Sequence, residues 1–82
     1  NFERLQDFQP DILKIDGSLI KNITTNTYCK QIVETIQSFA NKINVKTVAE
    51  FVSNEAIFNE VKNIGIDYVQ GYYIGKPKEV FI

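Results

Sequence analysis

Residues 45–71, with the sequence VKTVAEFVSNEAIFNEVKNIGIDYVQG, contain two short apolar segments with an amphipathic helical pattern between them. The flanking segments, 45–50 and 66–70, have the length and β-branched content that are typical of strands. The helix between them can be capped by Ser53 or Asn54, and Gly65 follows its last turn, where glycine is favoured. Its expected buried stripe consists of Ile57, Phe58, Val61 and Ile64. A helix between two short strands predicts parallel strands joined by a crossover.

The same alternation extends toward the N-terminus. Residues 11–17, DILKIDG, predict a strand that is buried on both faces and closed by glycine. Residues 24–27 are rich in helix-capping side chains and precede the clearest helix of the chain. Its expected buried stripe is Cys29, Ile32, Val33, Ile36, Phe39, Ala40 and Ile43, and its expected exposed face is Lys30, Gln31, Glu34, Gln37, Asn41 and Lys42. The fold class is therefore α/β, with a parallel βαβαβ order.

Both ends of the chain are less regular. Apolar residues three apart in 2–8 indicate the end of a further helix, which Pro10 stops. The tail, residues 72–82, is expected to be mostly loop. We treat residues 1–82 as a single unit.

Composition excludes several classes of function. Nine basic and ten acidic residues give a formal net charge of -1, so binding to a DNA or RNA polymer is not expected. The chain has no histidine and one cysteine, which removes Ser-His and Cys-His nucleophilic chemistry and any internal disulfide. Cys29 belongs to the apolar stripe and is expected in the core. No apolar run approaches the roughly 18 residues of a membrane span.

Polar side chains stand at the ends of the expected strands. Lys14, Glu50 and Gln70 each lie in or at the carboxyl end of one strand. Ligands of parallel α/β folds bind at this edge, so the three side chains are candidates for one shared site. The alternative is structural: Lys14 would pair with a nearby carboxylate, Glu50 would begin a solvated loop, and Asp16 before Gly17 would form a turn.

The motifs DILKID (11–16), TVAEFV (47–52) and DYVQGYY (67–73), with Lys76 and Pro77 after them, resemble the last third of an EAL domain. This family hydrolyses the bacterial second messenger cyclic di-GMP to a linear dinucleotide. The resemblance implies that the chain is the C-terminal fragment of the domain, with the last three strands of a TIM-like (β/α)8 barrel. The other family motifs would precede Asn1, and residues 2–8 would end the fifth helix.

The resemblance also implies roles for individual residues. Lys14 would face the attacking water and the scissile phosphate, Glu50 would position water and metal or act as general base, and Gln70 would orient the site. Lys14 and Pro77 would contact the substrate, while Glu50 and Asp16 would bind metal. The complete domain would use divalent Mg or Mn, and we expect the fragment alone to hold none and to be inactive. We expect a cytoplasmic location, with any membrane anchor in another region of the parent protein.

Two residues depart from the family pattern. Phe51 stands where the motif has glycine, and we expect it to exclude a backbone conformation that glycine adopts easily. Ser53 replaces a glutamate of the motif. Two alternatives therefore stay open: an EAL domain that binds cyclic di-GMP or a protein without catalysis, and an unrelated α/β interaction module.

Three strands cannot close into a barrel, which leads to an expectation about assembly. The strands at 12–15 and 68–70 would both have unpaired edges, and the inner face would expose Ile12, Val48 and Tyr68. We therefore expect a homo-oligomer, most simply a two-fold dimer. In the alternative, helix ends or the tail fold over the open face and leave a monomer.

Overall fold

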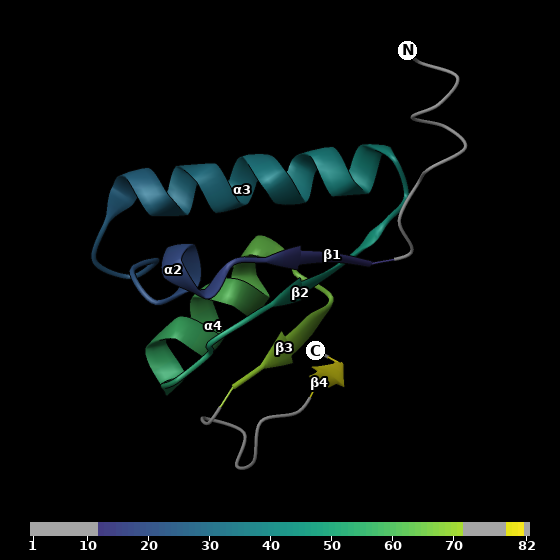
Figure 1. The fold of residues 1–82 in the computed structure, drawn as a ribbon. Coiled ribbons are helices and arrows are strands. Elements are labelled where there is room, and N and C mark those ends of the chain that lie inside the picture. The colour runs from purple at the N-terminus through teal and green to yellow at the C-terminus, as the bar shows by residue number, and fades with distance from the viewer. Residues whose placement is uncertain (1–11, 72–78, 82) are drawn as a thin grey trace.

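The computed structural model describes residues 12–71 and 79–81, and its elements include the predicted βαβαβ order, with a short helix and a fourth strand in addition (Figure 1). The expected helix end at 2–8 lies outside these residues. The strands are β1 (Ile12–Ile15), β2 (Lys46–Ala49), β3 (Tyr68–Gln70) and β4 (Glu79–Phe81). The helices are α2 (Gly17–Ile20), α3 (Thr27–Lys42) and α4 (Glu55–Ile64).

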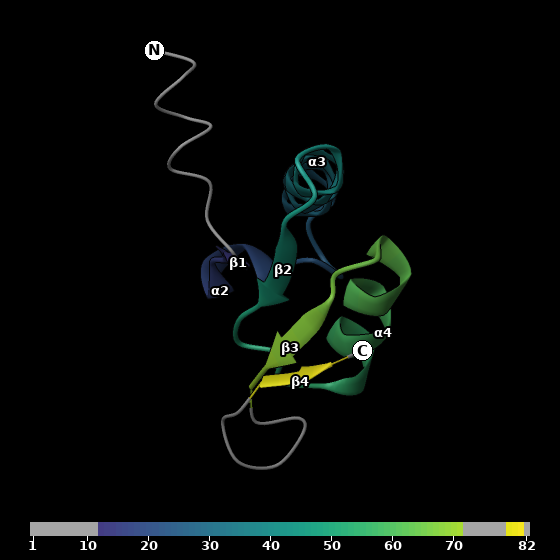
Figure 2. The same cartoon turned by 90° about the vertical axis from the view of Figure 1, so that its right-hand side faces the viewer.

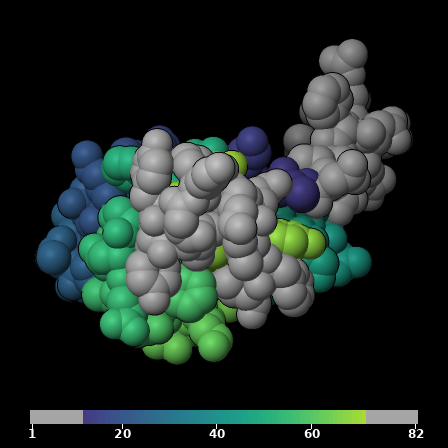
Figure 3. Space-filling model, turned by 90° about the horizontal axis from the view of Figure 1, so that it is seen from below, coloured from purple at the N-terminus to yellow at the C-terminus, as the bar shows by residue number. Residues whose placement is uncertain are grey.

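The strands form one sheet in the order β1-β2-β3-β4. The first three are parallel, with Ile15 paired to Ala49 and Ala49 paired to Val69. In the space-filling view, the start of β1 (purple), the residues just before β2 (teal) and the start of β3 (yellow-green) lie at the same end of the molecule (Figure 3). This end therefore contains the amino ends of the three parallel strands. The carboxyl ends of the three strands therefore meet at the opposite edge, as the sequence predicts.

The described part of the tail, which was expected to be mostly loop, is a strand. Residues 79–81 form β4, which pairs antiparallel with β3, with Val69 opposite Val80. The prediction of an unpaired edge on β3 is therefore wrong, because a strand from the same chain takes its hydrogen bonds. Among the described strands, β1 forms one edge of the sheet.

Helices α3 and α4 lie on the same side of the sheet (Figure 2). Every second strand residue faces these helices. The core between the helices and the strands is aliphatic. Its buried members are Ile15, Ile20, Ile23, Val33, Ala49, Val52, Ile57, Val61, Ile66 and Val69.

Side-chain caps explain where the two long helices begin. The Asn26 side chain accepts hydrogen bonds from the backbone N–H groups of Tyr28 and Cys29 at the start of α3. Asn54, rather than Ser53, caps α4 by accepting from the N–H of Ile57 at 2.9 Å. These contacts satisfy amide groups that have no partner inside the helix.

Helix α3 is rotated from its expected orientation. Gln37, expected on the exposed face, is buried, whereas Phe39, expected in the buried stripe, is 57% exposed. Val33, Gln37 and Ala40 are the buried residues of the helix. These residues are four and three positions apart, so the buried stripe of α3 is narrower than the stripe of apolar residues that the sequence predicts. Cys29 is half-buried at the margin of this stripe rather than in the core.

The inner face of the sheet is also not uniformly open. Ile12 is 42% exposed, but Val48 is fully buried and Tyr68 is half-buried. Val48 pairs with Lys14 on one side and Tyr68 on the other, and both carry longer side chains than valine. The expectation that Val48 is exposed is therefore wrong.

A buried polar network accounts for the position of Gln37. The Thr47 hydroxyl lies 2.6 Å from Gln37 Oε1 and accepts a hydrogen bond from the Asp67 backbone N–H at 3.2 Å. Asp67 Oδ2 in turn accepts from the Thr47 backbone N–H at 3.0 Å. The Gln37 amide donates to Asn41 Oδ1. The network therefore connects α3 to β2 and to the residue before β3, since buried polar groups need partners.

The replacement Thr47→Val tests this network. It keeps the side-chain shape but leaves Gln37 Oε1 and the Asp67 N–H without their partner, so we expect a loss of about 1–3 kcal/mol in stability. Thermal unfolding of the full-length protein measures it. The control is Thr35→Val, since the exposed Thr35 hydroxyl donates to the Gln31 carbonyl of its own helix, α3. Equal transitions for both variants would contradict a structural role for the network.

At the surface, Lys30 of α3 and Glu60 of α4 form an ion pair, with Nζ and Oε1 3.0 Å apart. The hydrogen bond to the Glu60 carboxylate and its charge raise the pKa of Lys30. None of the helices in the described part of the chain has the length and apolar character needed to cross a membrane.

Candidate functional site

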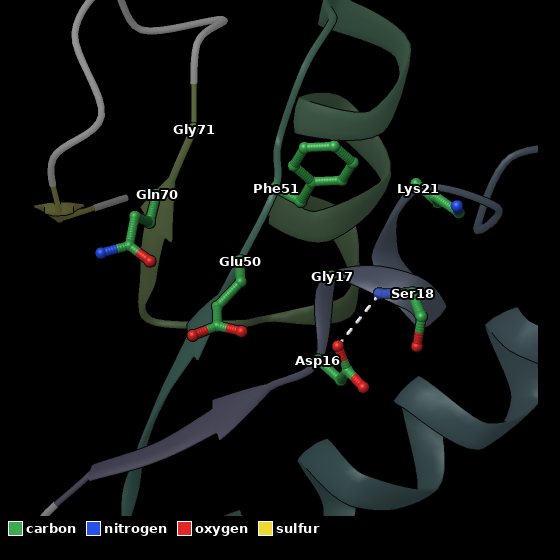
Figure 4. Close-up of a pocket in the computed structure, with 8 residues that line it drawn as sticks. All are labelled: Asp16, Gly17, Ser18, Lys21, Glu50, Phe51, Gln70 and Gly71. Carbon is green, nitrogen blue, oxygen red and sulfur yellow. Dashed lines mark hydrogen bonds between the residues drawn. The ribbon is translucent and has the colours of Figure 1, made fainter.

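A pocket of about 430 Å³ opens at the carboxyl ends of β1, β2 and β3 (Figure 4). It combines two carboxylates, an amide, an amine and an aromatic ring with backbone groups. Its described lining residues are Asp16, Gly17, Ser18, Lys21, Glu50, Phe51, Gln70 and Gly71.

Glu50 occupies the middle strand end of the pocket. Its backbone N–H donates to the Ile15 carbonyl at 3.2 Å, which continues the ladder between β1 and β2 by one residue. In Figure 4 its carboxylate lies between the side chains of Asp16 and Gln70. The three residues directly follow or end three adjacent strands, because Ile15, Ala49 and Val69 are paired. The structure therefore brings Glu50, Gln70 and Asp16 together.

Asp16 has a local structural task in this site. Its Oδ1 accepts a hydrogen bond from the Ser18 backbone N–H at 3.2 Å and caps α2. From the sequence, Asp16 is expected either to form a turn or to bind metal, and this contact agrees with the turn. The hydrogen bond from Ser18 uses Oδ1, one of the two carboxylate oxygens of Asp16.

Lys14 lies on β1, two residues before Asp16 and on the same face of the sheet. It pairs with Val48, and Val48 pairs with Tyr68, so Lys14 is two residues before the level of Glu50 and Gln70. Two strand residues correspond to roughly 6.6 Å. Lys14 is exposed on the face that it shares with Asp16, but it is not among the described residues that line the pocket.

Two of the lining residues, Ser18 and Lys21, were not expected at the site. Ser18 belongs to α2, a four-residue helix that was not predicted, and Lys21 follows the helix as its C-cap residue. The available signal is Asp16 before Gly17 and Ser18, a capping residue directly after a strand. The Lys21 amine points away from Glu50 in Figure 4. Pro77, a predicted substrate contact, lies outside the described residues.

Phe51 overturns one expectation. Its backbone has φ of 67°, within the left-handed region that favours glycine, so the phenylalanine does not exclude this conformation. Hydrogen bonds on both sides determine the backbone here: Glu50 N–H donates to the Ile15 carbonyl, and Val52 N–H donates to the Gln70 carbonyl at 2.9 Å. The path of the chain is therefore kept, although the residue is not glycine.

The donor atoms of the pocket match part of a divalent metal site. Carboxylate oxygens of Glu50 and Asp16 are the kind of ligand that Mg²⁺ prefers. Among residues 12–71 and 79–81, no group of three or more acidic, histidine or cysteine side chains is placed to hold a metal ion. The described residues thus supply suitable oxygens for a metal but not a complete set.

The chain is an α/β domain with parallel strands joined by helices, and its acidic and amide side chains gather at the strand ends, the edge where ligands of such folds bind. The family model of the EAL domain matches residues 1–77, and the chain belongs to this family.

Curated relatives and solved structures agree with this assignment. The chain is 47% identical over 78 residues to the cyclic di-GMP phosphodiesterase PdeF of Escherichia coli K12, covering 95% of this chain and 10% of the relative. It is 42% identical over 74 residues to the cyclic di-GMP phosphodiesterase PdeB of Shewanella oneidensis, covering 90% and 9%. The chain thus spans about a tenth of the length of these curated relatives.

A standalone EAL protein from Vibrio cholerae O395, solved with bound c-di-GMP, superposes with a TM-score of 0.82 at 36% identity. The match covers 89% of this chain and 31% of that chain. The predicted α/β class and the resemblance to the EAL family are confirmed.

Proposed function

We propose that this chain is part of a cyclic di-GMP phosphodiesterase that opens one phosphodiester of cyclic di-GMP to give linear pGpG. The observation that carries the proposal is the position of Glu50 and Gln70 at adjacent strand ends above one pocket, in a chain of the EAL family. The relatives PdeF and PdeB are both named as cyclic di-GMP phosphodiesterases, which supports cyclic di-GMP as the substrate. We place the chain in the C-terminal third of the domain, as the last three parallel strands of its barrel.

The proposed roles follow from charge and position. Glu50, half-buried at the middle strand end, orients the attacking water and accepts its proton. Gln70 orients the reacting groups by hydrogen bonding from the next strand. Lys14 lies deeper on the face that it shares with Asp16 and supplies a fixed positive charge for the phosphate as negative charge develops. Pro77 would contact the substrate from the following segment.

The family resemblance implies Mg or Mn in the complete domain. Divalent metals in such sites activate water and stabilise the leaving oxygen. Glu50 and Asp16 would contribute carboxylate oxygens, and the remaining ligands would come from residues outside this chain. We infer that the 82-residue chain alone holds no metal and has no activity.

Binding of cyclic di-GMP without hydrolysis is the second candidate function. Ser53 favours it, because this exposed residue replaces a glutamate of the family motif and does not cap α4. Glu50, Gln70 and Lys14 are all present, which favours the enzyme.

The test is product formation by the purified full-length protein. With Mg²⁺ or Mn²⁺, we expect conversion of cyclic di-GMP to pGpG, measured by chromatography, and we expect no conversion by the 82-residue chain. Titration calorimetry with Ca²⁺ present then measures binding separately from turnover. Binding without turnover in Mg²⁺ and Mn²⁺ would favour the second function, and neither binding nor turnover would contradict both. Turnover by the isolated chain would contradict the need for ligands from outside it.

Assembly and location also remain proposals. We propose that the 82-residue chain alone forms a homo-oligomer, which is supported by the described β1 edge and by the 42% exposure of Ile12. The paired edge of β3 and the burial of Val48 reduce the apolar surface that a partner would cover. A cytoplasmic location is supported by the free thiol of Cys29, which suits a reducing compartment.

A further inference from the structure

Phe51 adopts a backbone conformation that its side chain disfavours. Among the described residues, Asn44 and Phe51 are the non-glycine residues with positive φ, at 59° and 67°. Asparagine tolerates this region, whereas a bulky aromatic residue there is a real outlier. Such outliers cluster at ligand sites, and they persist where the surroundings determine the backbone.

Burial does not compensate for this strain. The side chain of Phe51 is 51% exposed, while the next residue, Val52, is fully buried. The ring lines the same pocket as Glu50, but the two side chains leave the end of β2 in different directions (Figure 4). The aromatic surface is thus presented to the pocket rather than to the core.

Gly17 provides the space that the ring occupies. A Cβ atom on Gly17 would lie 2.7 Å from Cβ and 3.3 Å from Cγ of Phe51, which is closer than such atoms normally approach. The base of the Phe51 side chain therefore packs directly over the backbone at the start of α2. Contact with Gly17 restricts the positions open to the ring.

We propose that Phe51 determines substrate affinity by stacking its ring against a purine base of the bound dinucleotide. Aromatic rings stack on bases without needing particular hydrogen bonds. Phe51 directly follows Glu50 and both side chains line the same pocket, so a dinucleotide that fills this pocket meets the aromatic ring with a base and the carboxylate with a phosphodiester. This role rests on the proposed function, because it assigns a contact for the same substrate.

The experiment compares steady-state kinetics of full-length variants with cyclic di-GMP. Phe51→Leu keeps an apolar side chain but removes the ring, and we expect its KM to rise about tenfold with a smaller change in kcat. Phe51→Tyr keeps the ring and is expected to restore most of the affinity. Phe51→Gly removes both ring and strain, so its KM should rise while its thermal unfolding temperature does not fall. The matched control is Phe39→Leu, since Phe39 is 57% exposed on α3, outside the pocket lining.

The outcomes separate this inference from the proposed function. If the wild-type protein turns over cyclic di-GMP and Phe51→Leu keeps its KM within twofold, the stacking role is overturned and the function stands. Equal KM increases in Phe51→Leu and Phe39→Leu would also overturn it. If Phe51→Leu does not fold, Phe51→Gly against Phe51→Tyr decides. If the wild-type protein binds cyclic di-GMP without turnover, the same variants are compared by their Kd values. If the wild-type protein neither binds nor hydrolyses cyclic di-GMP, both the proposed function and this role of Phe51 are refuted.

Discussion

Replacing Glu50 by glutamine in the full-length protein is expected to lower cyclic di-GMP turnover by about 10²–10⁴-fold. The amide keeps the size of the side chain but removes the charge and the basic oxygen that would accept the proton of water. Glu50 is half-buried at the pocket and its backbone is held by the Ile15 carbonyl, so the fold should be unchanged. Chromatography of pGpG measures turnover, and circular dichroism checks the fold.

The control for this variant is Glu55→Gln. Glu55 is exposed in the first turn of α4 and is not among the described residues that line the pocket. Lys14→Ala is expected to reduce turnover strongly as well, because it removes the fixed positive charge that the phosphate would meet. Full activity of a folded Glu50→Gln protein would refute the assigned role of Glu50, and full activity of Lys14→Ala would refute that of Lys14.

Replacing Gly71 by alanine is expected to destabilise the protein by about 2–4 kcal/mol and to disturb the pocket. Gly71 has φ of 152° and its backbone packs against that of Val52. A Cβ atom there would lie within 2.8 Å of three backbone atoms of Val52, which cannot move as a flexible side chain would. The Val52 N–H also donates to the Gln70 carbonyl, so a shift at this point breaks the contact between the two strand ends.

Thermal unfolding of the full-length protein measures this effect, with Gly65→Ala as the control. Gly65 also has positive φ, 97°, but a Cβ atom there would have no neighbour within 4 Å. It therefore reports backbone strain alone, about 1 kcal/mol. If both variants unfold at the same temperature, the steric account of Gly71 is wrong.

Periodicity and capping chemistry predicted most of the elements. Alternating strands and helices with Asn26, Asn54 and Gly65 at helix ends are local signals, because the groups involved are a few residues apart in the chain. The strand ends that carry Glu50 and Gln70 were predicted for the same reason. Helix α2 has four residues, which is too short for a periodic pattern.

Side-chain burial on α3 could not be predicted from its apolar pattern. Gln37 is buried where its Oε1 accepts a hydrogen bond from the Thr47 hydroxyl, ten residues away on β2, whereas Phe39 is exposed. This partner is on another element, so the local pattern of α3 does not reveal it. β4 escaped prediction for a related reason. Its pairing with β3 depends on a strand edge that is distant from the local pattern of residues 79–81.

The sequence by itself determined the kind of each main element, the α/β class and the edge of the sheet where polar residues gather. These properties depend on neighbours along the chain. Only the tertiary structure decided that Asp16, rather than Lys14, is level with Glu50 and Gln70, because strand register is set by pairing between distant segments. It also decided the conformation of Phe51, whose intrinsic preference is overridden by hydrogen bonds from the residues on either side to two neighbouring strands.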